Sequence, residues 1–308
     1  MTIEELNALV KSGEIDEFIR VCEARQVKAL SKIADEAASS GKTRVVLAAG
    51  ASSAGKTTTA KRLCTQLRVD GLAAMHLSTD DYFVGNSRNP RDENGDFDYE
   101  TVHCVDMERL ERDVAALLDG EEVHLRRFDF LEHEGYDAPE TVRLAKGGAI
   151  VLEGLHALNP LVLSGLDDGV KFGLFIEPRT QLQVFGEARL PPADGRLLRR
   201  LVRDNSFRKL PPAETFRSWQ KVLDGERKWI DPYRANARTV FDSGLEYELA
   251  VLKPFAAGLL EVARHFRPDD PRPAALAALL AAIEPASPVC VPGDSILRET
   301  IGGSMLEY

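Results

Sequence analysis

The residues with the clearest chemical potential form a phosphate-binding pattern early in the 308-residue chain. Gly50, Gly55, Lys56 and Thr57 fit G-x-x-x-x-G-K-[ST], with a short apolar run before the pattern and a helical pattern after it. The glycines let backbone N–H groups turn inward, and the helix N-terminus adds positive charge, so that such a loop holds nucleotide phosphates. Lys56 would lie between the β- and γ-phosphates, Thr57 would bind Mg²⁺, and Thr58 would contact the α-phosphate. The predicted nucleotide-binding residues are Gly50, Ser52, Ser53, Ala54, Gly55, Lys56, Thr57 and Thr58.

Two acidic residues follow predicted strands. Asp80 comes after the run 73–78, and Glu153 comes directly after the run 149–152. Ligands of a parallel α/β sheet gather beyond the carboxyl ends of its strands, so both carboxylates are expected near the phosphates. A carboxylate there can take the proton of an attacking hydroxyl or hold the Mg²⁺ water shell. We assign Asp80 to the base and Glu153, with Thr57, to the metal; helix capping or a turn is the alternative for Asp80.

A stripe of arginines occupies one face of a predicted helix, opposite a leucine-rich face. Its members are spaced i, i+3, i+4 and i+7: Arg196, Arg199, Arg200 and Arg203. Four like charges repel one another, so in an acidic protein this spacing indicates an anion that the arginines face. Guanidinium groups on a mobile helix can close over a triphosphate and stabilise the transferring phosphoryl group. A solvated face paired with acids such as Asp204 is the alternative.

Strand-like runs alternate with helical patterns between residues 44 and 266. This order predicts an α/β fold of the P-loop NTPase type, in which a mostly parallel sheet is flanked by helices. The turn-rich segment 86–98 is too long for a minimal connection and is a candidate functional loop. We expect strands at 44–49, 73–78, 122–127, 149–152, 171–176 and 248–252, and helices at 56–70, 107–118, 196–229, 254–265 and 274–283.

The segments on either side of this region have a different character. Two helical patterns, 2–12 and 15–38, come first, and Thr2-x-x-Glu5 forms a capping box at their start. The run RPDDPRP begins at residue 267 and marks a boundary before a final helix and a Pro/Gly-containing tail. We therefore expect an N-terminal helical extension at 1–40, the phosphate-loop domain at 41–266, and a C-terminal helix and tail at 267–308.

The composition excludes several classes of protein. A net charge of −10 opposes broad binding to nucleic acid or to anionic lipid. The longest apolar stretch, 274–283, is about half of a bilayer span, and the N-terminus lacks the pattern of a signal peptide. The four cysteines form no C-x-x-C pair, which argues against a zinc site or a disulfide framework. We expect a soluble, cytoplasmic protein that acts on a small molecule; assembly into a homo-oligomer is left open.

Taken together, the motifs resemble the uridine kinase and phosphoribulokinase family of P-loop kinases. The likeness runs from about residue 44 to residue 260 and is carried by GASSAGKTT (50–58), LSTDDYF (77–83), DFDYE (96–100), RRFDFLEH (126–133), VLEGLHALNP (151–160) and RLLRRLVRD (196–204). Other segments are similar to the kinase part of bacterial TGS-containing nucleoside kinase-like proteins, namely NPRDENG (89–95), GERKWIDPY (225–233), YELAVLKP (247–254) and DSILRETIGGS (294–304). None of the 308 residues resembles the TGS region, so no partner function of that region is carried over.

The resemblance implies ATP or GTP as donor, Mg²⁺, and transfer of the γ-phosphoryl group to a primary hydroxyl, which in uridine kinases is the 5′-OH of uridine or cytidine. It implies that Asp80 is the catalytic acid residue that receives the proton and that Asp98 binds ribose. Arg199 and Arg203 match the lid arginines of the family. The residues that match the base-holding segment are Phe128, Phe130 and His133, and Arg208 is a weaker match to a substrate-side arginine.

Two departures from the family pattern leave the acceptor open. Uridine kinases typically have tyrosine where Phe128 stands, and the insertion 185–195 differs from short uridine kinases. The leading hypothesis is an ATP-dependent small-molecule kinase acting on a nucleoside. A second keeps the chemistry and changes the acceptor to a sugar, a polyol or another hydroxylated metabolite. A third is a nucleotide-gated regulatory or RNA-associated module; the acidic charge argues against broad contact with RNA.

Overall fold

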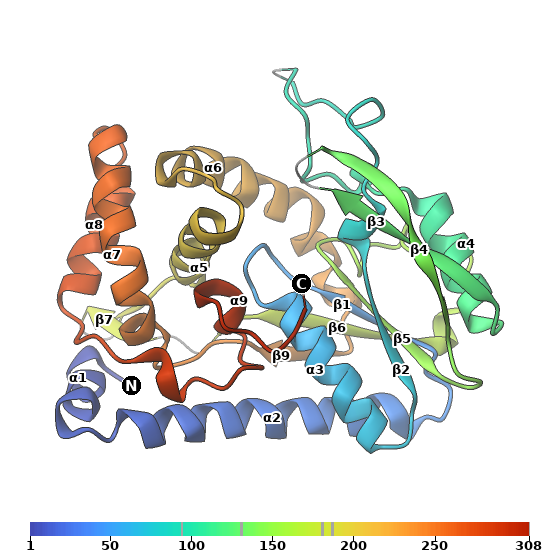
Figure 1. The fold of residues 1–308 in the computed structure, drawn as a ribbon, viewed down its shortest axis with the longest axis horizontal. Helices are drawn as coiled ribbons and strands as arrows, with labels where there is room; N and C mark the ends of the chain where they lie inside the picture. Colours follow the sequence, from blue (N-terminus) through green and yellow to red (C-terminus); the bar gives the residue numbers. More distant parts are fainter. Residues whose placement is uncertain (94, 130–131, 180–181, 186–187, 308) are drawn as a thin grey trace.

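A five-stranded parallel sheet forms the centre of the computed structural model (Figure 1). The structure describes residues 1–93, 95–129, 132–179, 182–185 and 188–307. Helices flank the sheet, which confirms the predicted α/β class. In spatial order the strands are β2 (Ala74–Ser78), β5 (Ala149–Gly154), β1 (Val45–Ala49), β6 (Lys171–Glu177) and β9 (Thr239–Asp242).

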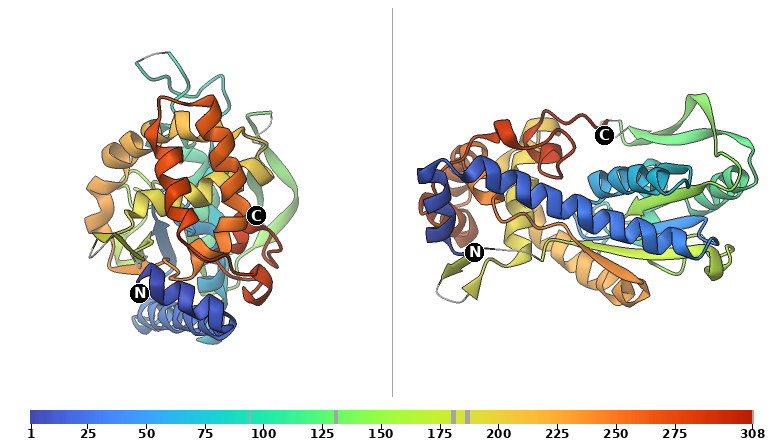
Figure 2. Two further views of the ribbon diagram at one scale, coloured as in Figure 1. Left: turned by 90° about the vertical axis from the view of Figure 1, so that its left-hand side faces the viewer. Right: turned by 90° about the horizontal axis from the view of Figure 1, so that it is seen from below.

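Both faces of this sheet are buried, as the continuous apolar runs of its central strands require. On one face, Val46 packs with side chains from α2 (Ile15–Ser39) and α3 (Lys56–Val69). On the other face, Val45 and Leu47 pack with α4 (Met107–Leu118). The long helix α2 runs alongside α3, as the views from two sides show (Figures 1 and 2). The sheet is therefore a rigid platform whose carboxyl edge can hold a site.

A second group of helices packs beside the sheet. Their shared core includes Leu6 and Ile19 from the N-terminal helices together with Leu197, Trp219 and Leu260. The segments expected as an N-terminal extension and a C-terminal tail thus share one core with the middle of the chain; their limits as domains remain a prediction. The helices of this group, besides α2, are α1 (Ile3–Ser12), α5 (Pro192–Phe207), α6 (Pro212–Trp229), α7 (Glu248–Phe266), α8 (Pro271–Ala281) and the short α9 (Arg298–Ile301). The capping box of Thr2 and Glu5 at the start of α1 is confirmed.

Two predictions of strands need correction. The run 248–252 is not a strand; it forms the N-terminal end of helix α7. The fifth strand of the sheet is β9. Leu249 to Leu252 are all buried, and a short, fully apolar run does not reveal its period. The expected strand at 122–127 exists as β3 (Glu122–Asp129), but it lies outside the main sheet.

β3 pairs antiparallel with β4 (Glu134–Arg143), a strand that was not expected from the sequence. β4 is mostly exposed and polar, so it lacks the apolar alternation by which strands are recognised. β7 (Gln183–Phe185), which ends where the insertion 185–195 begins, pairs antiparallel with β8 (Ala188–Arg189). The expected helical stretch 196–229 divides into α5 and α6 ahead of two consecutive prolines, Pro211 and Pro212. Across the described residues, we find no helix with the length and apolar content that a membrane crossing requires.

Candidate active site

The phosphate loop leads from β1 directly into α3, as its pattern requires. Gly50 lies so close to β6 that an added Cβ would stand 2.3 Å from the carbonyl oxygen of Ile176. Gly55 has φ +84°, and its added Cβ would stand 2.4 Å from Cγ2 of Ile296. Only glycine fits these two positions without a shift of neighbouring atoms. Lys56 donates a hydrogen bond from Nζ to the carbonyl oxygen of Ala51, 3.1 Å away, so the amine lies over the loop.

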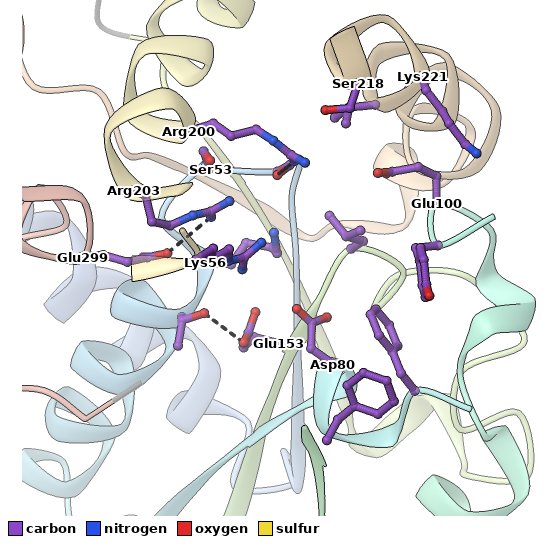
Figure 3. A pocket seen from close by; sticks show the side chains of 18 of the residues that line it. Ser53, Lys56, Asp80, Glu100, Glu153, Arg200, Arg203, Ser218, Lys221 and Glu299 are labelled. Atoms are coloured by element: carbon purple, nitrogen blue, oxygen red, sulfur yellow. Dashed lines mark hydrogen bonds and ion pairs between the residues drawn. The ribbon is translucent and has the colours of Figure 1, made fainter. Parts of the chain in front are cut away.

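A pocket of about 370 Å³ opens beside this loop at the carboxyl edge of the sheet. Figure 3 shows Arg203 and Glu299 on one side of the pocket and Glu100 with Lys221 on the other. Between these two sides lie Lys56, Asp80 and Glu153. The predicted site residues that line the pocket are Ser52, Ser53, Gly55, Lys56, Thr57, Asp80, Phe128, His133, Glu153, Arg203 and Arg208. The sequence therefore selected a set of residues that the fold brings together.

Glu153 is the penultimate residue of β5 and is almost fully buried. Its Oε1 accepts a hydrogen bond of 3.0 Å from the Thr57 hydroxyl and lies 3.8 Å from Nε2 of His76. Burial alone raises the pKa of a carboxyl group, but His76 and Lys56 together hold the pKa of Glu153 below its usual value. Glu153 is therefore ionised at neutral pH. The hydroxyl of Thr57 and the carboxylate of Glu153 form an oxygen pair that suits the coordination shell of Mg²⁺.

Asp80 follows β2 in a short 3₁₀ turn, Thr79–Tyr82, and its backbone N–H is capped by the Ser78 hydroxyl at 3.2 Å. Its Oδ1 is buried and accepts no hydrogen bond from the described residues. Burial and the nearby charge of Glu153 raise the pKa of Asp80 to about 6, against the opposing effect of Lys56. Two neighbouring carboxyl groups thus titrate in different ranges, which is a common arrangement where one of them exchanges a proton.

The arginine stripe divides between two environments. Arg200 and Arg203 line the pocket, and Arg200 donates to the Ser52 hydroxyl at 2.8 Å. Arg196 is buried and donates at 3.2 Å to the Ser52 carbonyl oxygen. Arg208, just beyond α5, lines the pocket too, and the charge of Arg203 together with burial lowers the pKa of Arg208 to about 10. Arg200, Arg203 and Arg208 therefore face the pocket together.

Arg199 does not join them. It is 2% exposed and forms an ion pair with Glu248 of α7, to which its Nε donates at 3.1 Å. It also donates at 3.0 Å to the carbonyl oxygen of Ser243. Its guanidinium group ties α5 to α7 and lies outside the main pocket lining, where Arg200 stands instead. The helical spacing could not separate these adjacent arginines, because both can lie on one broad face.

The far side of the pocket is aromatic. The rings of Phe83 and Phe128 meet edge to face, with centroids 5.7 Å apart. The ring of Tyr99 stacks on the ring of His133, and the Tyr99 phenol oxygen lies 3.4 Å from Nδ1 of His133. Phe128 and His133 thus lie where a planar ligand could pack. The predicted residue Phe130 lies outside the described residues.

Glu100 lines the pocket in place of Asp98, the acid that the family resemblance assigned to ribose. Asp98 uses its Oδ1 to accept from the backbone N–H of Glu100 at 3.1 Å and does not line the pocket. Glu100 does line it, and burial raises the pKa of Glu100 to about 7 despite the charge of Arg200. Ser218 and Lys221, one turn apart on α6, were also missed. Glu100 belongs to a motif that the sequence did single out, whereas no local pattern relates α6 to the phosphate loop.

Comparison with known proteins gives a family match. Residues 45–250 match the model of the Phosphoribulokinase / Uridine kinase family. A uridine kinase of Deinococcus deserti is 26% identical over 201 residues, which cover 65% of this chain and 87% of that protein. A uridine kinase of Halobacterium salinarum is 28% identical over 204 residues, 64% of this chain and 78% of that protein. Among solved structures, a possible uridine kinase from Bacillus stearothermophilus is 20% identical, covers 65% of this chain and 89% of its own, and gives a TM-score of 0.43.

The family match extends over the strands, the phosphate loop, Asp80, Glu153 and the arginine helix. Phosphate loops occur in motors, switches and kinases alike, so the loop alone does not identify the chemistry. The match to the family model over residues 45–250 does identify the chemistry. The chain belongs to the phosphoribulokinase / uridine kinase family, and it is a phosphotransferase.

Proposed function

We propose that this kinase transfers the γ-phosphoryl group of ATP or GTP to a primary hydroxyl, with the 5′-hydroxyl of a nucleoside such as uridine or cytidine as the acceptor. The observation that carries the proposal is the position of Lys56 and Asp80 between two unlike sides of one pocket (Figure 3). The side formed by the phosphate loop and Arg203 is suited to the donor phosphates. The side formed by Phe128, His133 and Glu100 is suited to a planar base with a sugar.

In this arrangement Asp80 is the general base. With a pKa of about 6 it is ionised at neutral pH and is still basic enough to take the proton of an acceptor hydroxyl. The hydroxyl oxygen then forms the new bond to the γ-phosphorus, and the bond from that phosphorus to the bridging oxygen breaks to release the nucleoside diphosphate. Lys56, Arg200 and Arg203 stabilise the charge on the phosphoryl oxygens during transfer. Thr57 and Glu153 would hold Mg²⁺, whose charge neutralises the donor phosphates.

Glu100 takes the role that the family resemblance gave to Asp98. Its carboxyl group points into the pocket from the aromatic side, and a carboxylate can accept hydrogen bonds from two neighbouring hydroxyls of a ribose. Asp98 already accepts from the backbone N–H of Glu100, so it holds the turn that presents Glu100.

A second acceptor class is favoured by the polar groups on α6. Ser218 and Lys221 line the acceptor side, and Lys221 donates to Asp92 at 2.6 Å and to the carbonyl oxygen of Phe97 at 3.0 Å. Together with Glu100 they offer several partners to a hydroxylated ligand that has no aromatic base. A sugar or polyol is therefore the alternative acceptor.

The test is the release of nucleoside diphosphate from MgATP across a panel of nucleosides, sugars and polyols, with Lys56→Ala as background. Stimulation by uridine or cytidine supports the nucleoside proposal. Stimulation by a sugar or polyol alone keeps the mechanism and replaces the acceptor. A lack of stimulation by every hydroxylated compound would contradict the proposal.

A further inference from the structure

The C-terminal segment 294–307 lies against the phosphate loop, although it is outside the region that matches the family model. Ile296 is 2% exposed, and its side chain fills the space beside Gly55. Ser295 is buried in a hydrogen-bonded cluster with Glu23 and Tyr247. The segment is therefore anchored to the body of the protein ahead of α9.

Glu299 on α9 faces the donor side of the pocket from this anchored segment (Figure 3). Its Oε2 accepts a hydrogen bond of 3.2 Å from the Thr58 hydroxyl, and its Oε1 lies 3.9 Å from Nη1 of Arg203. The proposed function gives Arg203 to the donor phosphates, and the phosphate-loop pattern gives Thr58 to the α-phosphate. The Glu299 carboxylate therefore lies against a phosphate-loop hydroxyl and a pocket arginine at the same time.

We infer that Glu299 is an internal anion that competes with the donor nucleotide for Thr58 and Arg203 and so sets the affinity for the donor; this inference rests on the proposed function. A carboxylate and a phosphate cannot share these two partners, because like charges at that distance repel in a partly dehydrated site. Since Ile296 and Ser295 hold the segment, the exchange requires only rotation of the Glu299 side chain. The donor binds only to molecules in which Glu299 has released Thr58 and Arg203, so the apparent affinity for the donor falls as the fraction of such molecules falls.

The experiment measures equilibrium binding of MgATP by calorimetry to the wild type, Glu299→Gln and Glu307→Gln. The glutamine side chain of Glu299→Gln keeps an oxygen that can accept from Thr58 but carries no charge. Glu307 is an exposed acid on the same segment, so its variant controls for the change in net charge. We expect Glu299→Gln to bind MgATP about tenfold more tightly than the wild type, and Glu307→Gln to bind within about twofold of it. The KM for ATP should fall in Glu299→Gln.

Glu299→Asp gives a second test, because it keeps the charge but withdraws it by one methylene group. Its affinity should lie between those of the wild type and Glu299→Gln. Affinities in both variants equal to or below that of the wild type would overturn the inference. That outcome would overturn only the inference about Glu299, and not the proposed donor site, if the wild type binds MgATP and Lys56→Ala does not. Failure of every form to bind MgATP would instead overturn the donor site and this inference with it.

Discussion

Arg199 and Glu248 form an ion pair in the protein interior, with each side chain no more than 3% exposed. The pair joins α5 to α7, while the adjacent Arg200 points into the pocket and contacts the Ser52 hydroxyl of the phosphate loop. Two neighbouring arginines therefore have different tasks. One ties α5 to α7, and the other faces the pocket.

This division predicts that one of two matched substitutions mainly lowers stability and that the other mainly lowers turnover. Arg199→Met leaves Glu248 as an unpaired buried charge and should lower the free energy of unfolding by about 3–5 kcal/mol. Arg200→Met should lower kcat by about 10²–10³-fold, because one charged donor to the phosphoryl oxygens is lost. Its effect on unfolding should be the smaller of the two, because Asp204, the buried ion-pair partner of Arg200, keeps Arg203. Chemical denaturation and steady-state kinetics on both variants check this. A large loss of kcat in a folded Arg199→Met with unchanged stability would contradict the division.

The role of Asp80 can be separated from nucleotide binding. Asp80→Asn should bind MgATP as the wild type does but lose about 10²–10⁴-fold in kcat, since the amide cannot accept the acceptor's proton. Calorimetric titration with MgATP and turnover with the best acceptor of the panel give the two quantities. Turnover equal to that of the wild type would remove Asp80 from the mechanism.

The same substitution should stabilise the protein without ligand. The pKa of Asp80 is raised on folding, so its ionised form is less favourable in the protein than in the unfolded chain. This cost is absent at low pH, appears as the pH rises from about 4 to about 6, and is complete above that range. Asp80→Asn should therefore raise Tm by about 3 °C at pH 7.5 and leave it unchanged at pH 3.5. Melting curves at the two pH values check the difference.

The activity should depend on pH through the same carboxyl group. Below about pH 6 Asp80 is protonated and cannot act as a base, so kcat/KM should fall about tenfold per pH unit there and level off above pH 6. Glu100, whose pKa is raised to about 7, should add a second inflection. The pH dependence of kcat/KM in Glu100→Gln separates the contributions of Asp80 and Glu100, because the fall in kcat/KM below pH 6 should persist in this variant. Absence of that fall in Glu100→Gln would assign it to Glu100 instead.

Glu100 and Asp98 offer a comparison on the acceptor side. Glu100→Gln should raise the KM for the acceptor about tenfold or more, since a charged acceptor of hydroxyl hydrogen bonds is lost. Asp98→Asn retains an oxygen for the backbone N–H of Glu100, so its effect should be about threefold or less. Initial rates at varied acceptor concentration, with ATP saturating, measure both. The reverse order of effects would return the role to Asp98.

Local patterns of residues were enough to predict the parts of the protein whose chemistry is local. The phosphate loop depends on a strand, two glycines and a helix that follow one another directly in the chain, so its pattern carries the whole structure of the loop. The carboxylates of Asp80 and Glu153 could be placed near it because parallel strands deliver their carboxyl ends to one edge. The fold class followed from the same alternation of strands and helices.

Which of two similar residues faces the pocket depends on contacts between elements that are far apart in the chain. Arg199 and Arg200 have the same chemistry and adjacent positions, and the choice between them depends on Glu248, 49 residues away from Arg199. Glu100 rather than Asp98 enters the pocket because the turn uses the Asp98 carboxylate for its own backbone. The contact of Glu299 with Thr58 joins residues 241 positions apart. Such contacts have no sequence period, because they arise from packing between elements rather than from the geometry within one.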